Sequence, residues 1–387
     1  MATPFRVGLI GCGRISDIYL ENLARFPGIE VVACSSLDAA ESRDKAAKHG
    51  IAVSCTPDQL LARDDIEAVL NLTVPAAHAD ISLAAIDAGK HVYSEKPLAA
   101  SLADATQVMA HAAERGLTVA NAPDTFLGGR WQTARKLIDS GAIGAPTGVA
   151  AFVGTHGVER HHPNPDFYYQ QGGGPLLDLG PYYLSAMVFL LGPIAQVAGM
   201  TKRTFDRRQI ENGPRDGEWM PVEVDTHVNT LMAFESGVLG SMMISFDVWD
   251  SETPRLEIYG EDGSLCVPDP DPVHGANVFE GEVWYRTRDT ARWTHQPRPS
   301  GRASWQIAPN SHGFNYNARG LGLLEMADAI RTKRSPRANA ALAYHTLEAM
   351  LGVFKSQRLG EFVSVNSRCE RPALLPEDFA THNAFTV

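Results

Sequence analysis

"FRVGLIGCGRISDIYLENLARFP", residues 5–27, is the stretch that decides the fold class of the chain. Its apolar opening predicts a buried strand that ends in glycines. From residue 15 onward the apolar side chains recur at helical spacing, and Pro27 ends the helix. The turn between them, Gly11-Cys12-Gly13, has the strand–turn–helix context in which a helix N-terminus binds a dinucleotide pyrophosphate. The stretch therefore predicts a nucleotide-binding unit at the start of the chain.

Each residue of this turn has an expected task. Gly11 and Gly13 permit the tight turn and let the backbone approach the pyrophosphate. Arg14 and Ile15 open the helix whose first N–H groups face the ligand. Ser16 stands where the dinucleotide fingerprint has its third glycine, and its side chain is small enough for close packing. A glycine-rich corner without a ligand is the alternative interpretation of the same residues.

Strands and helices alternate through the first part of the chain, joined by short links. The expected strands after the first are 29–36, 66–74, 91–95 and 117–122, and the expected helices are 38–50, 76–89 and 101–116. This order is typical of a doubly wound parallel sheet. We therefore expect an α/β fold, with a dinucleotide-binding Rossmann domain over residues 1–124.

The pattern changes after about residue 145. Alternating runs at 227–249 and 255–267 predict an open, mostly antiparallel sheet, the first run as a hairpin around Glu235-Ser236-Gly237. Helical spacing returns at 318–333 and 340–358. A second, α+β domain is therefore expected over the rest of the chain (125–387), with its last helices as candidates for packing against the first domain.

The composition of the chain limits its partners and its compartment. A length of 387 residues suits two domains, and a net charge of −11 argues against nucleic acid or an anionic membrane as the main partner. No stretch has the apolar length of a signal peptide or a membrane span. The five cysteines form no CxxC pair, so neither a metal cluster nor a disulfide framework is expected. The expected compartment is the reducing cytoplasm.

The end of the second strand bears on the choice between NAD and NADP. An acidic residue there would accept hydrogen bonds from both ribose hydroxyls and select NAD. Here the strand ends at Ser36, and Asp38 follows two residues later. Ser36 would tolerate a 2′-phosphate better than an acid would, but no arginine follows it directly, and Arg43 lies further along the helix. The preference between the two cofactors stays open.

A third strand end carries Thr73, Pro75 and His78. Because ligands bind beyond the carboxyl ends of strands in an open α/β sheet, these residues could line the nicotinamide. The alternative for His78 is a surface residue at a proline-capped helix start.

A resemblance to a known family rests on six short segments taken together. They are GLIGCGRIS (8–16), LTVPAAHAD (72–80), YSEKPLA (93–99), LIDSGAIGAP (137–146), GGGPLLDLGPYYL (172–184) and GEDGSL (260–265). In this order the segments resemble the Gfo/Idh/MocA oxidoreductases, typified by glucose–fructose oxidoreductase and inositol dehydrogenase. The resemblance covers nearly the whole chain.

The resemblance implies that Lys96 points at the substrate hydroxyl beside the nicotinamide. An ammonium there can hydrogen-bond the substrate oxygen and stabilise developing negative charge. Glu95 would contact the cofactor or orient the turn. A cis bond before Pro97, frequent in the family, would hold Lys96 in one direction. An ordinary salt-bridged corner is the alternative for this segment.

The same resemblance gives the second half of the site to Asp178 and Tyr182, one helical turn apart. Asp178 would orient the substrate hydroxyls or accept hydrogen bonds from them. The family commonly has His where this chain has Tyr182, so Tyr182 becomes the acid–base partner of Lys96. Which of the two moves the proton stays open, and a core aromatic residue is the alternative for Tyr182.

A polar loop over residues 154–171 precedes these residues. His156 and His162 in this loop are candidates for lining the substrate site, because sugar hydroxyls need many donors and acceptors. The prolines of the loop and the spacing of its histidines argue against a metal site, and none is expected.

The activity implied is hydride transfer between nicotinamide and a secondary alcohol or ketone of a sugar, cyclitol or related polyol. The second domain would bind the substrate and form a homodimer or homotetramer. Two alternatives stay open. A tightly bound nicotinamide could oxidise the substrate transiently and so cleave a glycoside, as a lyase or hydrolase. A non-enzymatic sensor could bind the dinucleotide to regulate a partner, although Lys96, Asp178 and Tyr182 together argue against it.

Overall fold

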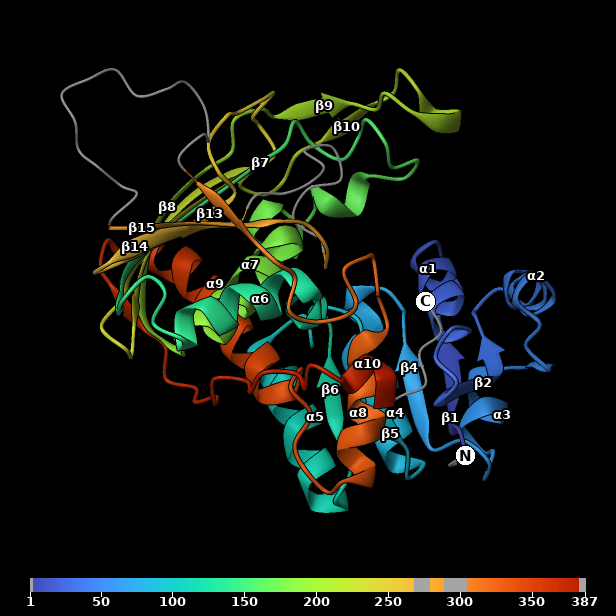
Figure 1. Ribbon diagram of the computed structural model, residues 1–387. Helices are drawn as coiled ribbons and strands as arrows, with labels where there is room; N and C mark the ends of the chain where they lie inside the picture. Colours follow the sequence, from blue (N-terminus) through green and yellow to red (C-terminus); the bar gives the residue numbers. More distant parts are fainter. Residues whose placement is uncertain (1–2, 268–278, 289–304, 383–387) are drawn as a thin grey trace. The chain divides into compact units, whose positions relative to one another are not determined.

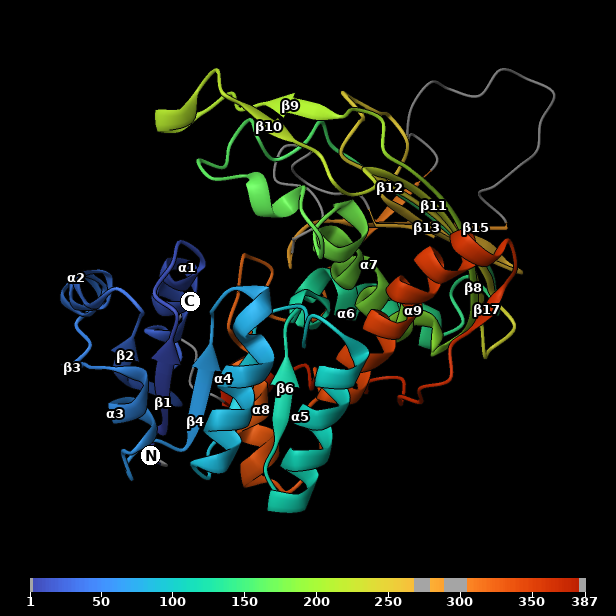
Figure 2. The same cartoon turned by 180° about the vertical axis from the view of Figure 1, so that it is seen from behind.

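The computed structural model describes residues 3–267, 279–288 and 305–382, and Figures 1 and 2 show it from opposite sides. The chain divides into two compact units. The first unit contains Met1–Leu127, Asn317–Tyr344 and Leu375–Val387, and the second contains Gly128–Tyr316 and His345–Leu374. The chain thus leaves the first unit and later returns to it.

The first unit is built on a six-stranded parallel sheet. Its strands are β1 (Phe5–Ile10), β2 (Ile29–Ser35), β3 (Val53–Ser54), β4 (Ala68–Asn71), β5 (His91–Ser94) and β6 (Val119–Asn121). They are ordered β3-β2-β1-β4-β5-β6, so the strand order reverses between β1 and β4. Apolar side chains such as Val7, Leu9 and Leu70 are fully buried, as expected for a parallel sheet covered on both faces. The predicted Rossmann sheet is confirmed.

Most helices of the first unit come directly after one of its strands in the chain. Two others belong to residues 317–344 and 375–387 and are orange and red in Figure 1. The helices of this unit are α1 (Ile15–Leu23), α2 (Ala39–His49), α3 (Pro57–Leu61), α4 (His78–Asp87), α5 (Leu102–Arg115), α8 (Leu321–Arg331) and α10 (Phe379–His382). Local signals set their ends. Ser101, for example, accepts the backbone N–H of Asp104 at 3.1 Å and starts α5, and Gly116 in the left-handed conformation ends it.

The predicted strands and helices of this unit are present with shifted ends. The predicted helix 76–89 begins as a 3-10 turn, Pro75–Ala77, before α4. β3 and α3 were not predicted, because segments of two and five residues are too short to show a periodic pattern.

The second unit is built on a nine-stranded sheet in the order β16-β15-β14-β13-β7-β12-β11-β8-β17. Its strands are β7 (Pro146–Gly154), β8 (Ile194–Lys202), β11 (His227–Phe234), β12 (Leu239–Ser245), β13 (Leu256–Gly260), β14 (Gly263–Cys266), β15 (Val283–Thr287), β16 (Gln306–Ala308) and β17 (Val363–Ser364). β7 and β12 run parallel, and the other paired strands described here run antiparallel. The expectation of an open, mostly antiparallel sheet is confirmed.

The predicted hairpin is formed by β11 and β12, with Gly237 at a positive φ of 86° in its turn. A separate two-stranded sheet joins β9 (Arg207–Gln209) to β10 (Trp219–Pro221). The helices are α6 (Gly129–Asp139), α7 (Pro175–Leu191) and most of α9 (Ala340–Leu359), and α7 packs against β7, β11 and β12 (Figures 1 and 2). Several side chains that point away from the core of this sheet, among them Met200, Leu231 and Leu239, are exposed.

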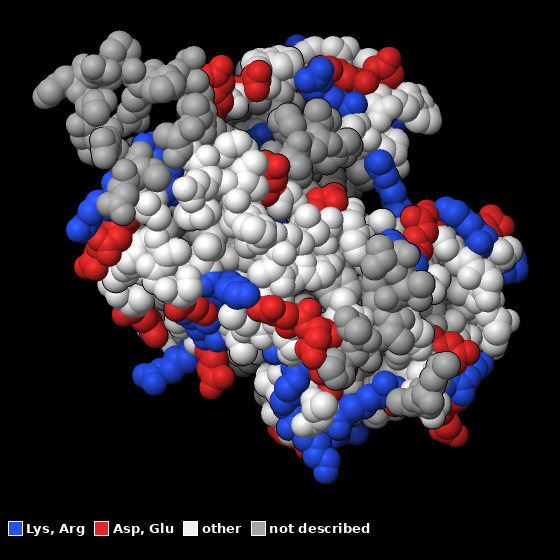
Figure 3. Space-filling view, in the orientation of Figure 1, with Lys and Arg blue, Asp and Glu red and all other residues white. Residues whose placement is uncertain are grey.

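Charged side chains of both signs are interspersed over the face that Figure 3 shows. The five cysteines are free thiols. Within the described residues, no helix combines the length and the hydropathy needed to cross a membrane.

Candidate active site

The glycine loop after β1 is shaped by contact with the end of β4. Gly11 has a φ of +102°, and a Cβ atom there would lie 2.5 Å from the carbonyl carbon of Leu72. A larger residue is therefore excluded at this position. Ser16 is fully buried, and its hydroxyl donates to the carbonyl of Gly13 at 2.7 Å. The small residue at the third fingerprint position thus fits, as expected from the sequence.

The N-terminus of α1 is available for an anion. Arg14 occupies the N-cap position, and no side chain caps the first turn. An ideal Cβ built on Gly13 meets no heavy atom within 4 Å, so the backbone there borders open space. A helix start without a side-chain cap and with an open approach suits the pyrophosphate of a dinucleotide.

Two carboxylates, Asp38 and Glu41, follow the end of β2, whereas the sequence pattern indicated only Asp38. Asp38 is the N-cap of α2, and its side chain accepts the backbone N–H of Ala40 at 2.8 Å. Glu41, in the first turn of the helix, accepts the hydroxyl proton of Ser36. Sequence reasoning named Ser36 and Asp38 but missed Glu41, because a helix residue five positions later is not expected to fold back onto the strand end.

The end of β4 is tied to the turn after β5 through His78. Its imidazole is fully buried, with Nδ1 2.6 Å from the carbonyl oxygen of Pro97 and Nε2 2.9 Å from that of Thr73. Burial lowers the pKa of His78, in spite of these two carbonyl contacts. The surface position considered as an alternative is therefore wrong. Thr73 is further held by its hydroxyl, which donates to Asn71 Oδ1 at 2.6 Å.

The Glu95-Lys96-Pro97 turn follows β5 and contains a cis bond between Lys96 and Pro97, as the resemblance implied. Glu95 is only 7% exposed. Its Oε1 accepts the Tyr19 hydroxyl proton at 2.9 Å and lies 3.5 Å from Arg319 Nη1. Its Oε2 accepts the backbone N–H of Lys96 at 2.8 Å. The carboxylate therefore fixes the backbone from which the Lys96 side chain projects.

Arg319 reaches Glu95 from the returning segment of the first unit. The two glycines beside it donate to Asp124, from Gly320 N at 3.0 Å and from Gly322 N at 2.8 Å. Burial raises the pKa of Asp124, although both N–H groups oppose the shift. Neither Arg319 nor Tyr19 was predicted as a site residue, because nothing in their local sequence marks a contact with so distant a turn.

In the second unit, α7 carries the other two predicted catalytic residues. Gly172 and Gly174 have φ values of +88° and +90°, and Pro175 follows at the first helical position. Asp178 is half-buried and Tyr182 is buried, and their spacing of four residues places both on one face of α7.

The 154–171 loop holds the two predicted substrate histidines in different settings. His156 stacks on Trp249 with ring centroids 3.3 Å apart, and its Nδ1 is buried with no hydrogen-bond partner among the described residues. Burial, with a contribution from Arg208, lowers the pKa of His156. His162 accepts the backbone N–H of Asn164 on Nδ1 at 3.2 Å.

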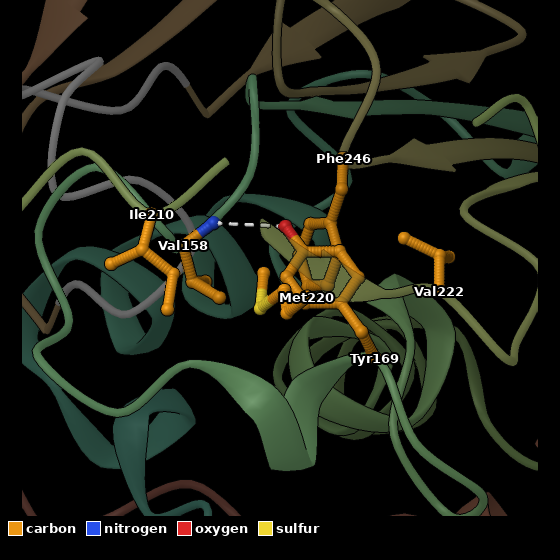
Figure 4. Close-up of a cluster of buried hydrophobic side chains, with 6 residues drawn as sticks. All are labelled: Val158, Tyr169, Ile210, Met220, Val222 and Phe246. Carbon is orange, nitrogen blue, oxygen red and sulfur yellow. Dashed lines mark hydrogen bonds between the residues drawn. The ribbon is translucent and has the colours of Figure 1, made fainter. Parts of the chain in front are cut away.

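A buried cluster anchors this loop. It consists of Val158, Tyr169, Ile210, Met220, Val222 and Phe246 (Figure 4). The Tyr169 hydroxyl accepts the backbone N–H of Val158 at 3.3 Å and donates to Glu159. The loop is thus packed against β9, β10 and the end of β12.

Arg208 on β9 adds a buried ionic network to the cluster. Its guanidinium contacts Glu159 at 2.5 Å, the carboxylate of Asp247, and the carbonyl of Phe246 at 2.8 Å. Both carboxylates are nearly buried. Within the described residues, no cluster of three or more His, Cys, Asp or Glu side chains is arranged to hold a metal ion.

Comparisons with known proteins agree with this arrangement. A family model described as an NAD-binding Rossmann fold of the oxidoreductase family matches residues 5–122, and the model of the GFO/IDH/MocA C-terminal domain matches residues 131–266. A 1,5-anhydro-D-fructose reductase from Ensifer adhaerens is 29% identical over 67% of this chain and 74% of its own length. A dTDP-3,4-didehydro-2,6-dideoxy-alpha-D-glucose 3-reductase from Streptomyces violaceoruber is 34% identical over 68% of this chain and 72% of its own length.

A solved structure shows the same fold. It is a levoglucosan dehydrogenase in complex with NADH, with a TM-score of 0.76 and 19% identity over 95% of this chain and 100% of its own. The glycine loop and the uncapped start of α1 provide what an NAD pyrophosphate needs, so the residues present fit the cofactor of the matched Rossmann domain. The first unit is an NAD-binding domain, and the chain belongs to the Gfo/Idh/MocA family of oxidoreductases.

Proposed function

We propose that the protein transfers a hydride between NAD(P) and a secondary alcohol or ketone of a sugar, cyclitol or related polyol. The observation that carries the proposal is the Glu95-Lys96-Pro97 turn, which buried contacts fix at the carboxyl edge of the sheet that bears the glycine loop. The bound nicotinamide supplies the hydride acceptor or donor. The side chains of the chain supply orientation and proton transfer.

Lys96 and Tyr182 handle the proton of the reacting hydroxyl in this proposal. The Lys96 ammonium hydrogen-bonds the substrate oxygen and stabilises the negative charge that develops on it. Tyr182 exchanges the proton with that oxygen or relays it to Lys96. Asp178 accepts hydrogen bonds from neighbouring hydroxyls, and Glu95 acts on the reaction through the Lys96 backbone as a positioning residue.

The substrate class is supported by the relatives and by the 154–171 loop. The relatives named above are described as acting on an anhydro sugar and a nucleotide-linked deoxy sugar. Imidazole nitrogens such as those of His156 and His162 can exchange hydrogen bonds with hydroxyl groups, and the cluster of Figure 4 packs residues of the same loop. We assign both histidines to the substrate.

The cofactor contacts are assigned to the carboxyl ends of four strands. The pyrophosphate is assigned to Gly11, Gly13, Arg14 and Ile15, the adenosine ribose to Ser36 and Asp38, and the nicotinamide side to Thr73, Pro75, His78, Glu95 and Lys96. His78 is buried, so we assign it an indirect role: its ring nitrogens contact the carbonyl oxygens of Thr73 and Pro97 and position these residues.

The same proposal includes a homodimer or homotetramer in the reducing cytoplasm. The exposed apolar side chains of the nine-stranded sheet, with a hollow of about 770 Å³ over Met200, Leu231 and Phe362, offer a surface that a second copy could cover. Light scattering should give a dimer or tetramer for the wild type and a smaller species for Leu231→Lys. A monomeric wild type would contradict this part.

The activity is tested by absorbance at the reduced-nicotinamide band during a screen of aldoses, inositols, anhydrosugars and glycosides with NAD and NADP in parallel. A dehydrogenase forms reduced cofactor in proportion to oxidised product. Conversion of a glycoside without net reduction of the cofactor would favour transient oxidation by a retained nicotinamide. Binding of dinucleotide without conversion of any polyol would favour a sensor.

A further inference from the structure

The turn from β2 to α2 contains a carboxylate, Glu41, that cofactor binding as assigned above does not use. β2 ends at Ser35, and the hydroxyl of Ser36 donates to Oε2 of Glu41. Glu41 lies in the first turn of α2, where a carboxylate is favoured by the helix dipole. The side chain therefore folds back over the strand end instead of extending into solvent.

The strand end that precedes Ser36 contacts the glycine loop, because the Gly11 N–H and the Cys12 thiol donate to the carbonyl of Ser35 at 2.9 and 3.4 Å. The pKa of the Cys12 thiol is raised, mainly by its contact with Cys34 and by burial, and the negative charge of Glu41 adds to the shift. Cys12 stands between Gly11 and Gly13, so Glu41 is near both the pyrophosphate loop and the end of β2. In a Rossmann domain this is the place of the adenosine ribose.

The carboxylate of Glu41 has capacity left for a ligand. A carboxylate has two oxygens with about four lone-pair sites, and the Ser36 hydroxyl uses one of them. The remaining sites can accept hydrogen bonds from the two hydroxyls of a ribose. Ser36 then orients Glu41.

Three of the four basic side chains of the same helix contact α1, and the fourth, Arg43, stands two residues beyond Glu41. Lys45 lies 2.7 Å and Lys48 3.0 Å from Oδ1 of Asp17 on α1, and His49 contacts the same oxygen at 2.7 Å. Asp38, a second carboxylate of the turn, caps the helix. Residues 36–41 therefore contain two carboxylates and no cation, where a 2′-phosphate would need positive charge.

We propose that Glu41 binds the ribose hydroxyls of NAD and excludes NADP, with Ser36 as its positioning residue. A 2′-phosphate carries close to two negative charges at pH 7 and would face the Glu41 carboxylate at short range. The 2′-phosphate would also take the place of the ribose 2′-hydroxyl, which in NAD donates a hydrogen bond to the Glu41 carboxylate. The inference rests on the dinucleotide site of the proposed function. It adds that this site selects NAD over NADP.

Binding of NAD and NADP to the purified full-length chain tests the inference without any substrate. Dissociation constants are measured by calorimetry for the wild type, for Glu41→Gln and for Ser36→Ala. The control is Glu30→Gln, which removes the same charge from the opposite end of β2, where Glu30 faces Arg6 at 3.7 Å. Circular dichroism establishes that each variant is folded.

The wild type should bind NAD more tightly than NADP. In Glu41→Gln the ratio of the two dissociation constants should fall by about tenfold or more, through weaker NAD binding and stronger NADP binding, since a hydrogen bond to a charged group is lost. Ser36→Ala should shift the ratio in the same direction by less, and Glu30→Gln should leave it unchanged.

An unchanged ratio in folded Glu41→Gln would overturn the inference, as would a wild type that binds both dinucleotides equally well. Either result would leave the proposed function standing. A wild type that binds neither dinucleotide would overturn the proposed function and this inference together.

Discussion

Glu95 shows how single contacts define the candidate site. A nearly buried carboxylate needs N–H, O–H or cationic partners, and Glu95 finds them in Tyr19, in Arg319 and in the backbone of Lys96. The Glu-Lys-Pro segment can be recognised from the sequence, because it directly follows an apolar strand. Tyr19 and Arg319 could not be, since only the folded chain brings them to the turn. Glu41 escaped prediction for the same reason.

Replacing Glu95 should cost far more stability than replacing its phenolic partner. Glu95→Gln keeps the shape but leaves Arg319, whose side chain is 5% exposed, beside a neutral amide. We expect a loss of about 3 kcal/mol in the free energy of unfolding, typical of a broken buried ion pair. Tyr19→Phe removes one hydrogen bond and should cost about 1 kcal/mol. Urea unfolding measures both, and equal losses would show that the ion pair contributes little.

At the scale of elements, the strands and helices of the Rossmann sheet could be predicted because their patterns are local. The apolar runs of β1, β4 and β5 and the helical spacing of α5 are each visible without knowledge of the fold. The anchoring of the 154–171 loop could not be predicted. It depends on β9 and β10, which follow the loop in the chain and span only three residues each.

This anchoring predicts a difference between two arginines of the same region. Arg208→Met leaves Glu159 and Asp247 buried without their cation, and should lower the free energy of unfolding by about 3 kcal/mol. Arg160→Met breaks an exposed pair with Glu211 and a cation–π contact with Trp249, and should change the free energy of unfolding by about 1 kcal/mol or less.

Hydrogen exchange within residues 156–170 separates a local effect from a global one. Amides of this loop should exchange faster in Arg208→Met than in the wild type at the same temperature, while those of the Rossmann sheet stay protected. Equal stability of the Arg208 and Arg160 variants would contradict the anchoring role.

At the scale of the whole molecule, each unit contains a histidine that must stay neutral, the half-buried His91 in the first and the buried His345 in the second. In the first unit, His91 Nδ1 accepts the backbone N–H of Thr118 at 2.9 Å. In the second, His345 Nε2 accepts the backbone N–H of Ile194 at 2.9 Å. A protonated ring could accept neither bond, and burial lowers the pKa of both histidines below the ordinary value of 6.5. Such tertiary contacts are invisible in the sequence, which shows His91 and His345 only as polar residues in a strand and a helix.

The free energy of unfolding should therefore fall with pH below about 6.5. A group whose pKa is lowered on folding binds more protons in the unfolded chain, so its contribution is complete above pH 6.5 and is lost as the pH falls through the folded-state pKa. A carboxylate whose pKa is lowered on folding, such as Asp166 beside Arg215, loses its contribution to stability mainly as the pH falls through its ordinary pKa of 3.8. Burial raises the pKa of Asp124, which acts in the opposite direction, so variants of the two histidines are needed to assign the change between about pH 5 and 7.

Urea unfolding at several pH values checks this dependence. His91→Asn and His345→Gln each keep an acceptor near the original nitrogen but do not titrate, so stability should fall less steeply with pH in each variant. A wild type whose stability is constant from pH 7 to about 5 would contradict the assignment of these rings as neutral acceptors.

We propose that the turn after β5 presents a catalytic lysine, and the decisive measurement is the turnover number of Lys96→Met at saturating NAD. Dissociation constants for NAD, measured beside it, keep cofactor binding separate from chemistry. We predict that turnover of a polyol found in the screen falls by about 100-fold or more, as expected for loss of an acid–base group, while NAD binding changes only slightly. A variant that binds NAD and still oxidises the polyol at the wild-type rate would show that Lys96 takes no part in the reaction.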